Sequence, residues 1–272
     1  MSAPRSRMLE LGSGRPTIEL VEAGQGPNLL FMHGAGGVVW DGALPLLAKH
    51  FHVYAPVLPG YGKSAALGLD LLEDQFDLFQ HGFDVMEALG LEKPLLVGES
   101  LGGWIAGEMA ALRPKEVGKL AVLAPVGLWR DEAPVTDLFG LSIGELLPFL
   151  FHDMASSGAK AMSQLTTLMS EKDDKTQAQV DQLIALLMGF RTAAKFLFPV
   201  PETGLERRLW RIRVPTLVLW GAQDRFIAPS YAEIWAKHVK NAQIVLIERC
   251  GHLLLQEQPE ASAKEIQRFA GI

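Results

Sequence analysis

Short apolar runs alternate along this chain with longer segments in which apolar residues recur every three or four positions. The runs are residues 17–21, 28–32, 52–55, 94–98, 120–124, 216–220 and 244–247. Fully buried parallel strands have continuous apolar sequences, and the connection between two parallel strands is usually a helix. The alternation therefore predicts an α/β fold, with a mostly parallel central sheet and helices on both of its faces.

One long stretch, residues 128–210, breaks this alternation because it contains no strand-like run. It is rich in Leu, Phe and Met, and its patterns predict several short helices, at residues 138–151, 159–170, 176–190 and 191–198. A helical segment inserted between two strands of one sheet forms a cap, or lid, over the sheet edge. We therefore predict a core made of residues 1–127 and 211–272, with a helical cap over residues 128–210.

The composition excludes several classes of protein. The 272 residues carry a formal net charge of −6 and one cysteine, which argues against a nucleic-acid partner, an internal disulfide and a cysteine-based zinc site. No apolar run reaches the roughly 18 residues of a membrane span, and no secretory signal begins the chain. We expect a cytoplasmic monomer or homodimer with no membrane partner, no metal and no cofactor.

The segment 98–102, GESLG, matches the pattern G-x-S-x-G. It begins where the apolar run 94–98 ends and leads into a helical pattern that contains Trp104. This passage from strand to helix is the context in which a serine hydroxyl is presented as a nucleophile. The alternative for the motif alone is an ordinary glycine-rich turn, and the context favours Ser100 as the nucleophile.

A second glycine-rich segment, HGAGG at residues 33–37, follows an earlier buried run. Such a loop can bring the backbone N–H of Ala35 beside the serine. Together with the N–H of Leu101, it would form an oxyanion hole for the negative charge of a tetrahedral intermediate. The alternative is a flexible turn, and we assign His33 a packing role that fixes the loop.

A serine hydroxyl needs a base, and the base needs an orienting acid. Among seven histidines, His252 follows the last predicted strand directly, at the sheet edge where open α/β sheets bind ligands. Asp224 occupies the corresponding place after the run 216–220. The order Ser100, Asp224, His252 is the one expected of a nucleophile, acid and base on this type of sheet.

These segments resemble a known family. The chain is similar to capped serine hydrolases of the α/β-hydrolase superfamily, in the carboxylesterase or C–C hydrolase branch. The resemblance rests on HGAGG, LPGYGKS, VGESLGG, GAQDRFIAP and CGHLLLQEQPE, at residues 33–37, 58–64, 97–103, 221–229 and 250–260. It implies an α/β-hydrolase fold and the roles of nucleophile, base and orienting acid for Ser100, His252 and Asp224. Members often carry Asp where this chain has Val57, which leaves the triad unaffected.

The resemblance leaves several reactions open. Ser100 argues against the members that use Asp at this position, which are haloalkane dehalogenases and epoxide hydrolases. Esterases, lactonases, C–C bond hydrolases of aromatic degradation, perhydrolases, acyltransferases and non-catalytic ligand receptors remain. C–C hydrolases usually have Trp after the catalytic histidine, where this chain has Leu253. We expect hydrolysis of a small to medium apolar ester.

The apolar cap predicts a pocket that selects a small-molecule, ester-like substrate. As candidate substrate contacts we take Gly36 and Trp104 from the core and Phe149 and Met154 from the cap. Methionine and aromatic side chains suit such a pocket because they adapt to the shape of an apolar ligand.

Overall fold

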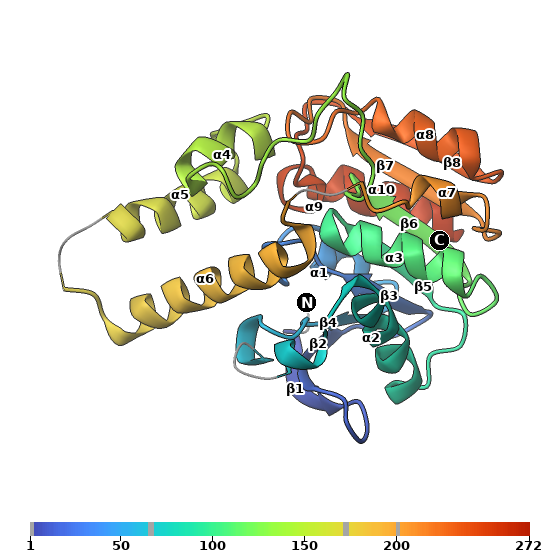
Figure 1. Ribbon diagram of the computed structural model, residues 1–272, viewed down its shortest axis with the longest axis horizontal. Helices are drawn as coiled ribbons and strands as arrows, with labels where there is room; N and C mark the ends of the chain where they lie inside the picture. Colours follow the sequence, from blue (N-terminus) through green and yellow to red (C-terminus); the bar gives the residue numbers. More distant parts are fainter. Residues whose placement is uncertain (1–2, 65–67, 171–173, 200–201) are drawn as a thin grey trace.

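The computed structural model describes residues 3–64, 68–170, 174–199 and 202–272. Its centre is one eight-stranded sheet in the order β1-β2-β4-β3-β5-β6-β7-β8 (Figure 1). The strands are β1 Arg5–Glu10, β2 Thr17–Ala23, β3 Asn28–Met32, β4 His52–Pro56, β5 Leu95–Glu99, β6 Lys119–Leu123, β7 Thr216–Gly221 and β8 Ala242–Ile247. β2 is antiparallel to both β1 and β4, and the pairs from β4 through β8 are all parallel. The predicted mostly parallel α/β sheet is confirmed.

The helices of the core lie in front of and behind this sheet (Figure 1). They are α1 Ala43–Leu47, α2 Gln75–Ala88, α3 Leu101–Leu112, α7 Glu206–Leu209, α8 Tyr231–His238, α9 Leu254–Glu257 and α10 Pro259–Ala270, with 3-10 turns η1 Gly62–Ser64 and η2 Leu69–Leu71. No helix in the part of the chain that the structure describes is both long and apolar enough to cross a membrane.

Three helices between β6 and β7 project to one side of the sheet (Figure 1). They are α4 Ile143–Leu150, α5 Ser157–Ser170 and α6 Gln177–Leu197. Ser142 and Thr176 begin α4 and α6 with capping boxes, in which each side chain and its partner three residues later satisfy the first free N–H groups. The two helices predicted at residues 176–190 and 191–198 form the single helix α6.

Helix α7 falls inside the range predicted for the cap but packs on α3 and α8 of the core. The Arg208 guanidinium donates from Nε and Nη2 to the carboxylate of Glu108, which is buried in α3. Trp104 Nε1 donates to the same carboxylate over 3.4 Å. A buried charge requires such a partner, so this ion pair holds the segment that returns from the cap to β7 against α3.

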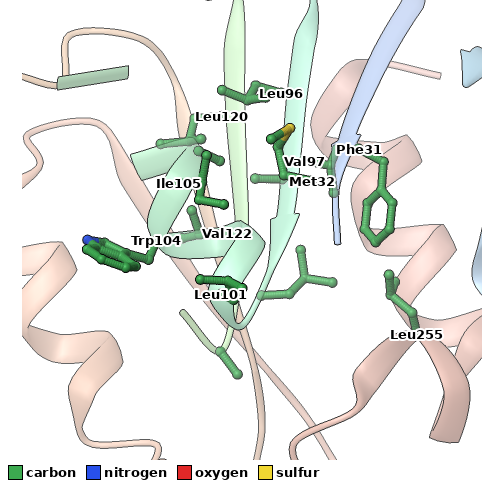
Figure 2. Close-up of a cluster of buried hydrophobic side chains, with 14 of the residues drawn as sticks. Phe31, Met32, Leu96, Val97, Leu101, Trp104, Ile105, Leu120, Val122 and Leu255 are labelled. Atoms are coloured by element: carbon green, nitrogen blue, oxygen red, sulfur yellow. The ribbon is translucent and has the colours of Figure 1, made fainter. Parts of the chain in front are cut away.

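Buried apolar side chains fill the space between α3 and the centre of the sheet. Figure 2 shows Leu101, Trp104 and Ile105 of α3 in this cluster beside side chains of β3, β5 and β6. The helix approaches the strands closely because Gly98 and Gly102 have no side chains. A Cβ on Gly102 would lie 1.9 Å from the Met32 carbonyl oxygen, and one on Gly98 would lie 2.2 Å from the Gly102 carbonyl oxygen.

We expect Gly102→Ala to destabilise the protein by about 3 kcal/mol or more, because the new methyl group would push α3 away from backbone that cannot yield. Gly144→Ala is the matched control, since a Cβ there meets no atom within 4 Å. It should leave the stability unchanged or raise it by about 0.5–1 kcal/mol. Urea unfolding of both variants measures the difference, and a loss below about 1 kcal/mol for Gly102→Ala would contradict the close contact.

Candidate active site

Ser100 lies in the turn that joins β5 to α3, with a positive φ of 54°. Non-glycine residues rarely adopt this conformation, and it is maintained only where the surrounding structure enforces it. Three backbone contacts hold the turn: the Ser100 N–H donates to the Leu123 carbonyl over 2.9 Å, and its carbonyl accepts from the N–H groups of Trp104 and Val126 over 3.1 and 3.3 Å. The turn presents the serine hydroxyl at the carboxyl edge of the sheet, above the N-terminus of α3.

The loops after β7 and β8 bring an acid and an imidazole to the same edge. His252 Nε2 lies 2.9 Å from Ser100 Oγ, and His252 Nδ1 lies 2.9 Å from Asp224 Oδ2. All three residues are buried. The structure therefore places the predicted nucleophile, base and acid in one hydrogen-bonded series, although they come from three separate loops.

The Asp224 carboxylate accepts four hydrogen bonds. Oδ1 accepts from the N–H groups of Phe226 and Ile227 over 2.8 and 2.9 Å, and Oδ2 accepts from Trp220 Nε1 over 3.1 Å and from His252. These donors hold the carboxylate in one orientation and stabilise its charge in a buried position. With Asp224 accepting from Nδ1–H, His252 Nε2 carries no proton and faces the serine hydroxyl, the geometry required of a general base.

Two backbone N–H groups beside Ser100 have no hydrogen-bond acceptor among the described residues: those of Ala35 and Leu101. Leu101 is the first residue of α3, where helix N–H groups normally lack a partner and favour negative charge. Ala35 lines the same cavity as Ser100. These are the two N–H groups that the sequence analysis predicted as the donors of an oxyanion hole.

The loop that carries Ala35 is held from two sides. The Tyr61 hydroxyl donates to the Ala35 carbonyl over 3.1 Å. His33 Nε2 accepts from the Leu58 N–H over 3.0 Å, while Nδ1 donates to the Gly34 carbonyl over 2.7 Å. Burial of the imidazole lowers the pKa of His33 to about 4, so His33 stays neutral in this network at neutral pH. The segment HGAGG at residues 33–37 and the segment LPGYGKS at residues 58–64 thus hold each other in place.

The cavity above Ser100 has a volume of about 20 Å³, space for roughly one water molecule. It is lined by Ala35, Ser100, Val126, Gly127, Val135, Leu138, Phe139, Leu197 and Phe226. Ser100 supplies the only polar side chain among these. Even a small ester is larger than this cavity. It can enter only if lining side chains from the cap and its connecting loops, such as Leu138, Phe139 and Leu197, move aside.

Four residues predicted to contact the substrate lie outside this lining. Trp104 is fully buried between α3 and the core, where its ring packs edge-on against Phe79. Phe149 and Met154 are 36% and 44% exposed, and a Cβ on Gly36 would meet no atom within 4 Å.

Val135, Leu138 and Phe139, which the sequence did not single out, line the cavity above Ser100. They belong to the irregular loop before α4, which has no periodicity that points inward. The sequence predicted a helix from residue 138, whereas α4 begins at Ile143, so Leu138 and Phe139 lie in the preceding loop.

The cap and the histidine loop are joined by hydrogen bonds that the sequence did not indicate. The carbonyl of Leu150, at the end of α4, accepts from the His252 N–H over 2.8 Å. The Glu257 carboxylate bridges both segments, because Oε2 accepts from the Gly251 N–H over 2.6 Å and Oε1 from the Asp153 N–H over 2.5 Å. Glu257 thus fixes the loop on which His252 lies against the first part of the cap.

Glu99, the residue before the serine, is also buried. Its Oε1 accepts from the Leu255 N–H over 3.3 Å. Burial raises the pKa of Glu99 to about 7, and the opposing effects of the Leu255 N–H, His252 and Gln256 are smaller. No three His, Cys, Asp or Glu side chains gather as a metal site within the described ranges.

Glu99→Gln tests this buried carboxyl. Its pKa is about 7 when folded and 4.5 as a free side chain, so between these values the unfolded chain releases a proton that the folded chain keeps. The native protein therefore loses stability as the pH rises through this window, and the variant does not. The stability of Glu99→Gln relative to wild type should rise by on the order of 2–3 kcal/mol from pH 4.5 to 8. Urea unfolding measures this, with exposed Glu87→Gln as control; a pH-independent difference would refute it.

Several known proteins are similar to this chain. The model of the alpha/beta hydrolase family matches residues 29–265. Monoacylglycerol lipase ABHD6 of Homo sapiens is 30% identical over 262 residues, which cover 90% of this chain and 76% of the human protein. A 2-hydroxy-6-oxo-6-phenylhexa-2,4-dienoate hydrolase of Burkholderia cepacia is 30% identical over 270 residues, covering 93% and 90% of the two chains.

Among solved structures, a membrane phospholipase A described as a bacterial virulence factor is similar over nearly the whole chain. It superposes with a TM-score of 0.70 at 26% identity, covering 99% of this chain and 86% of that one. The family match, the two relatives and the fold agree with one another. The chain belongs to the alpha/beta hydrolase family.

Proposed function

We propose that this protein is a serine hydrolase that cleaves carboxylic esters with an apolar acyl or alcohol part. One observation carries the proposal: the hydrogen-bonded series Asp224–His252–Ser100 ends in a cavity whose other side chains are all apolar. A carbonyl carbon held in this cavity lies beside a serine hydroxyl whose proton has an acceptor. The N–H groups of Ala35 and Leu101, which have no acceptor among the described residues, are the proposed donors to its oxygen.

The reaction follows from these positions. Ser100 Oγ attacks the ester carbonyl while His252 Nε2 takes its proton, and the N–H groups of Ala35 and Leu101 stabilise the tetrahedral oxyanion. The intermediate collapses to an acyl-serine, and the alcohol leaves with the proton from His252. Water then attacks the acyl group with His252 again as base, and the acid is released. Asp224 keeps the imidazole oriented and stabilises its positive charge in both steps.

The cavity favours an ester over the C–C bond substrate of the Burkholderia relative. A dienoate carries a carboxylate, which needs a cationic or hydrogen-bonding partner once it is removed from water. The described residues that line the cavity include no Lys, Arg or His. The residue after His252 is Leu253, whereas C–C hydrolases of this type usually have Trp there.

Ser100→Ala should lower kcat for p-nitrophenyl esters by about 10⁵–10⁶-fold, because serine and histidine act as one unit. Its thermal unfolding should change little, since the hydroxyl is small and its loss removes only the contact with His252. Ser170→Ala is the control, a substitution at an exposed serine of α5. If purified Ser100→Ala kept more than a few per cent of wild-type turnover, another residue would be the nucleophile.

The reaction class is tested with the same preparation on p-nitrophenyl esters, on lactones and on a 2-hydroxy-6-oxo-dienoate. We expect esters to be turned over with the highest kcat/KM. A higher kcat/KM for the dienoate, also abolished in Ser100→Ala, would show a C–C hydrolase. Binding of esters without turnover of any compound would show a receptor.

Leu138→Ala and Phe139→Ala should shift the preference among acyl chain lengths towards longer chains, because both enlarge the cavity above Ser100. Each methylene accommodated in an apolar pocket contributes about 1–3 kcal/mol of specificity. Phe149→Ala, on the exposed face of α4, is matched to Phe139→Ala and should leave the preference unchanged. Ratios of kcat/KM for acetate, butyrate and octanoate esters measure the shift; an equal loss for every ester would place these residues in the catalytic machinery instead.

A further inference from the structure

Helix α6 contacts the core along its C-terminal half, and a glycine makes this contact possible. Gly189 is buried in the interior of α6, where glycine is an unfavourable residue for a helix. A Cβ at this position would lie 2.8 Å from Tyr61 Cε1 and 3.0 Å from Tyr61 Cδ1. Figure 1 shows α6 running from the projecting part of the cap back to the core. The helix can lie this close to the Tyr61 ring because position 189 has no side chain.

The next turn of α6 makes a second contact of the same kind. Thr192 lies three residues after Gly189, on the same face of the helix. A Cβ on Gly60 would lie 1.9 Å from Thr192 Oγ1. Thr192 is buried, and its hydroxyl donates to the Met188 carbonyl over 3.1 Å. One glycine on each side thus brings α6 into direct contact with the loop of residues 58–64.

The Tyr61 side chain extends from this contact to the loop that carries Ala35. Its hydroxyl donates to the Ala35 carbonyl over 3.1 Å, and its ring meets the His33 ring edge-on, with the centroids 4.8 Å apart. The ring edge near Gly189 is also near Gly37, where a Cβ would lie 3.4 Å from Tyr61 Cδ1. Burial raises the pKa of the Tyr61 hydroxyl, which therefore keeps the proton that it donates. One ring thus contacts both the cap helix and the loop of the proposed oxyanion hole.

Ala35 depends on hydrogen bonds from both sides for its orientation. Gly36–Gly37 follow it directly, and glycine restricts the backbone least. His33 Nδ1 donates to the Gly34 carbonyl, in the peptide group before Ala35, and Tyr61 donates to the carbonyl of the peptide group after it. The Ala35 N–H belongs to the first of these groups, so it keeps one direction when both groups are held.

The loop that carries Tyr61 is itself bonded to strand β2. The Lys63 N–H donates to Glu19 Oε2 over 3.0 Å, and the Glu19 N–H donates to Ser64 Oγ over 2.6 Å. These bonds hold the backbone of the loop, so pressure from α6 acts on the Tyr61 ring. A displaced ring would carry its hydroxyl away from the Ala35 carbonyl.

We propose that Tyr61 is a positioning residue for the oxyanion hole and that α6 holds it in place through the contact at Gly189. The inference rests on the serine-hydrolase function proposed above. With α6 in this position, the Tyr61 hydroxyl keeps Ala35 oriented for the oxygen of a tetrahedral intermediate. Neither Tyr61 nor Gly189 lines the cavity, so the contact stabilises the transition state without binding the ground-state ester.

Tyr61→Phe removes the hydroxyl and keeps the ring. It should lower kcat for p-nitrophenyl butyrate by about tenfold, less than the roughly 100–1,000-fold cost of deleting an oxyanion donor itself. KM should change by less than about twofold, because the ester makes no contact with Tyr61. Tyr54→Phe is the control and should keep the wild-type kcat, since its hydroxyl contacts the His52 ring and Tyr54 does not line the cavity.

Gly189→Ala tests the contact with α6. The new methyl group should displace the Tyr61 ring and lower kcat by about three- to tenfold, again with little change in KM. Gly144→Ala, at a helical glycine of the cap where a Cβ meets no atom within 4 Å, should leave kcat unchanged. The double variant Tyr61→Phe/Gly189→Ala has no hydroxyl to displace, so its kcat should equal that of Tyr61→Phe within about twofold. Circular dichroism checks that each variant is folded.

Butaneboronic acid gives a measure that does not depend on turnover. Ser100 Oγ donates an electron pair to boron while its proton passes to His252, and an oxygen of the resulting tetrahedral anion takes the place of the oxyanion. Titration calorimetry should show the affinity for this compound falling in Tyr61→Phe and Gly189→Ala by the same factor as kcat. The two control variants should bind it as wild type does.

Unchanged kcat and boronate affinity in Tyr61→Phe, with wild type active, would overturn the inference and leave the proposed function intact. A rise in KM alone would do the same. So would losses that multiply in the double variant, because α6 would then act on the reaction by a route other than the hydroxyl. If wild type turned over no ester, the serine-hydrolase function itself would fail, and with it the oxyanion hole that Tyr61 is inferred to support.

Discussion

Helix α3 lies so close to the ends of β3 and β5 that there is no room for a side chain at positions 98 and 102. This approach leaves the chain between them only a tight turn, and Ser100 takes the positive φ that the turn demands. The N-terminus of α3 is thereby directed at the cavity, and the Leu101 N–H has no acceptor among the residues that the structure describes. The position of the hydroxyl, the direction of the helix dipole and one donor of the proposed oxyanion hole all follow from that one contact.

Around this turn the buried carboxylates are held in fixed positions by hydrogen bonds. Asp224 keeps a charge in the interior because four donors converge on it, and one of them is the imidazole that it orients. Glu99 and Glu257 are buried within reach of the same histidine loop and bind its backbone N–H groups. In a low-dielectric interior such groups must be bonded, so they also make the loop rigid. The hydrogen bonds that stabilise the buried Asp224 carboxylate therefore also hold His252 in the orientation that proton transfer needs.

The sequence predicted the elements that have a periodic pattern and the loops that directly follow the strands. Buried strands and amphipathic helices have periods, and the loops that follow strands meet at one edge, so the fold and the proximity of Ser100, Asp224 and His252 could be inferred. β1 escaped notice because its sequence, RSRMLE, lacks the apolar character of an inner strand. The cavity lining could not be found because Val135, Leu138 and Phe139 lie in a loop whose path depends on tertiary contacts.

The bonds between the cap and the histidine loop constrain the order of events in turnover. The Leu150 carbonyl accepts from the His252 N–H, and the Glu257 carboxylate accepts from the N–H groups of Gly251 and Asp153. Residues 150–153 are therefore bonded to the loop that carries His252. If the end of α4 lifted to admit substrate, the imidazole would lose its support at the same moment. For the proposed reaction, admission of substrate without loss of this support would require motion of α5, α6 or the loop before α4 while residues 150–153 stay in place. If the proposed reaction takes place here, a molecule in which α4 has detached would be open but would lack an oriented base, and bond cleavage would be confined to the closed conformation.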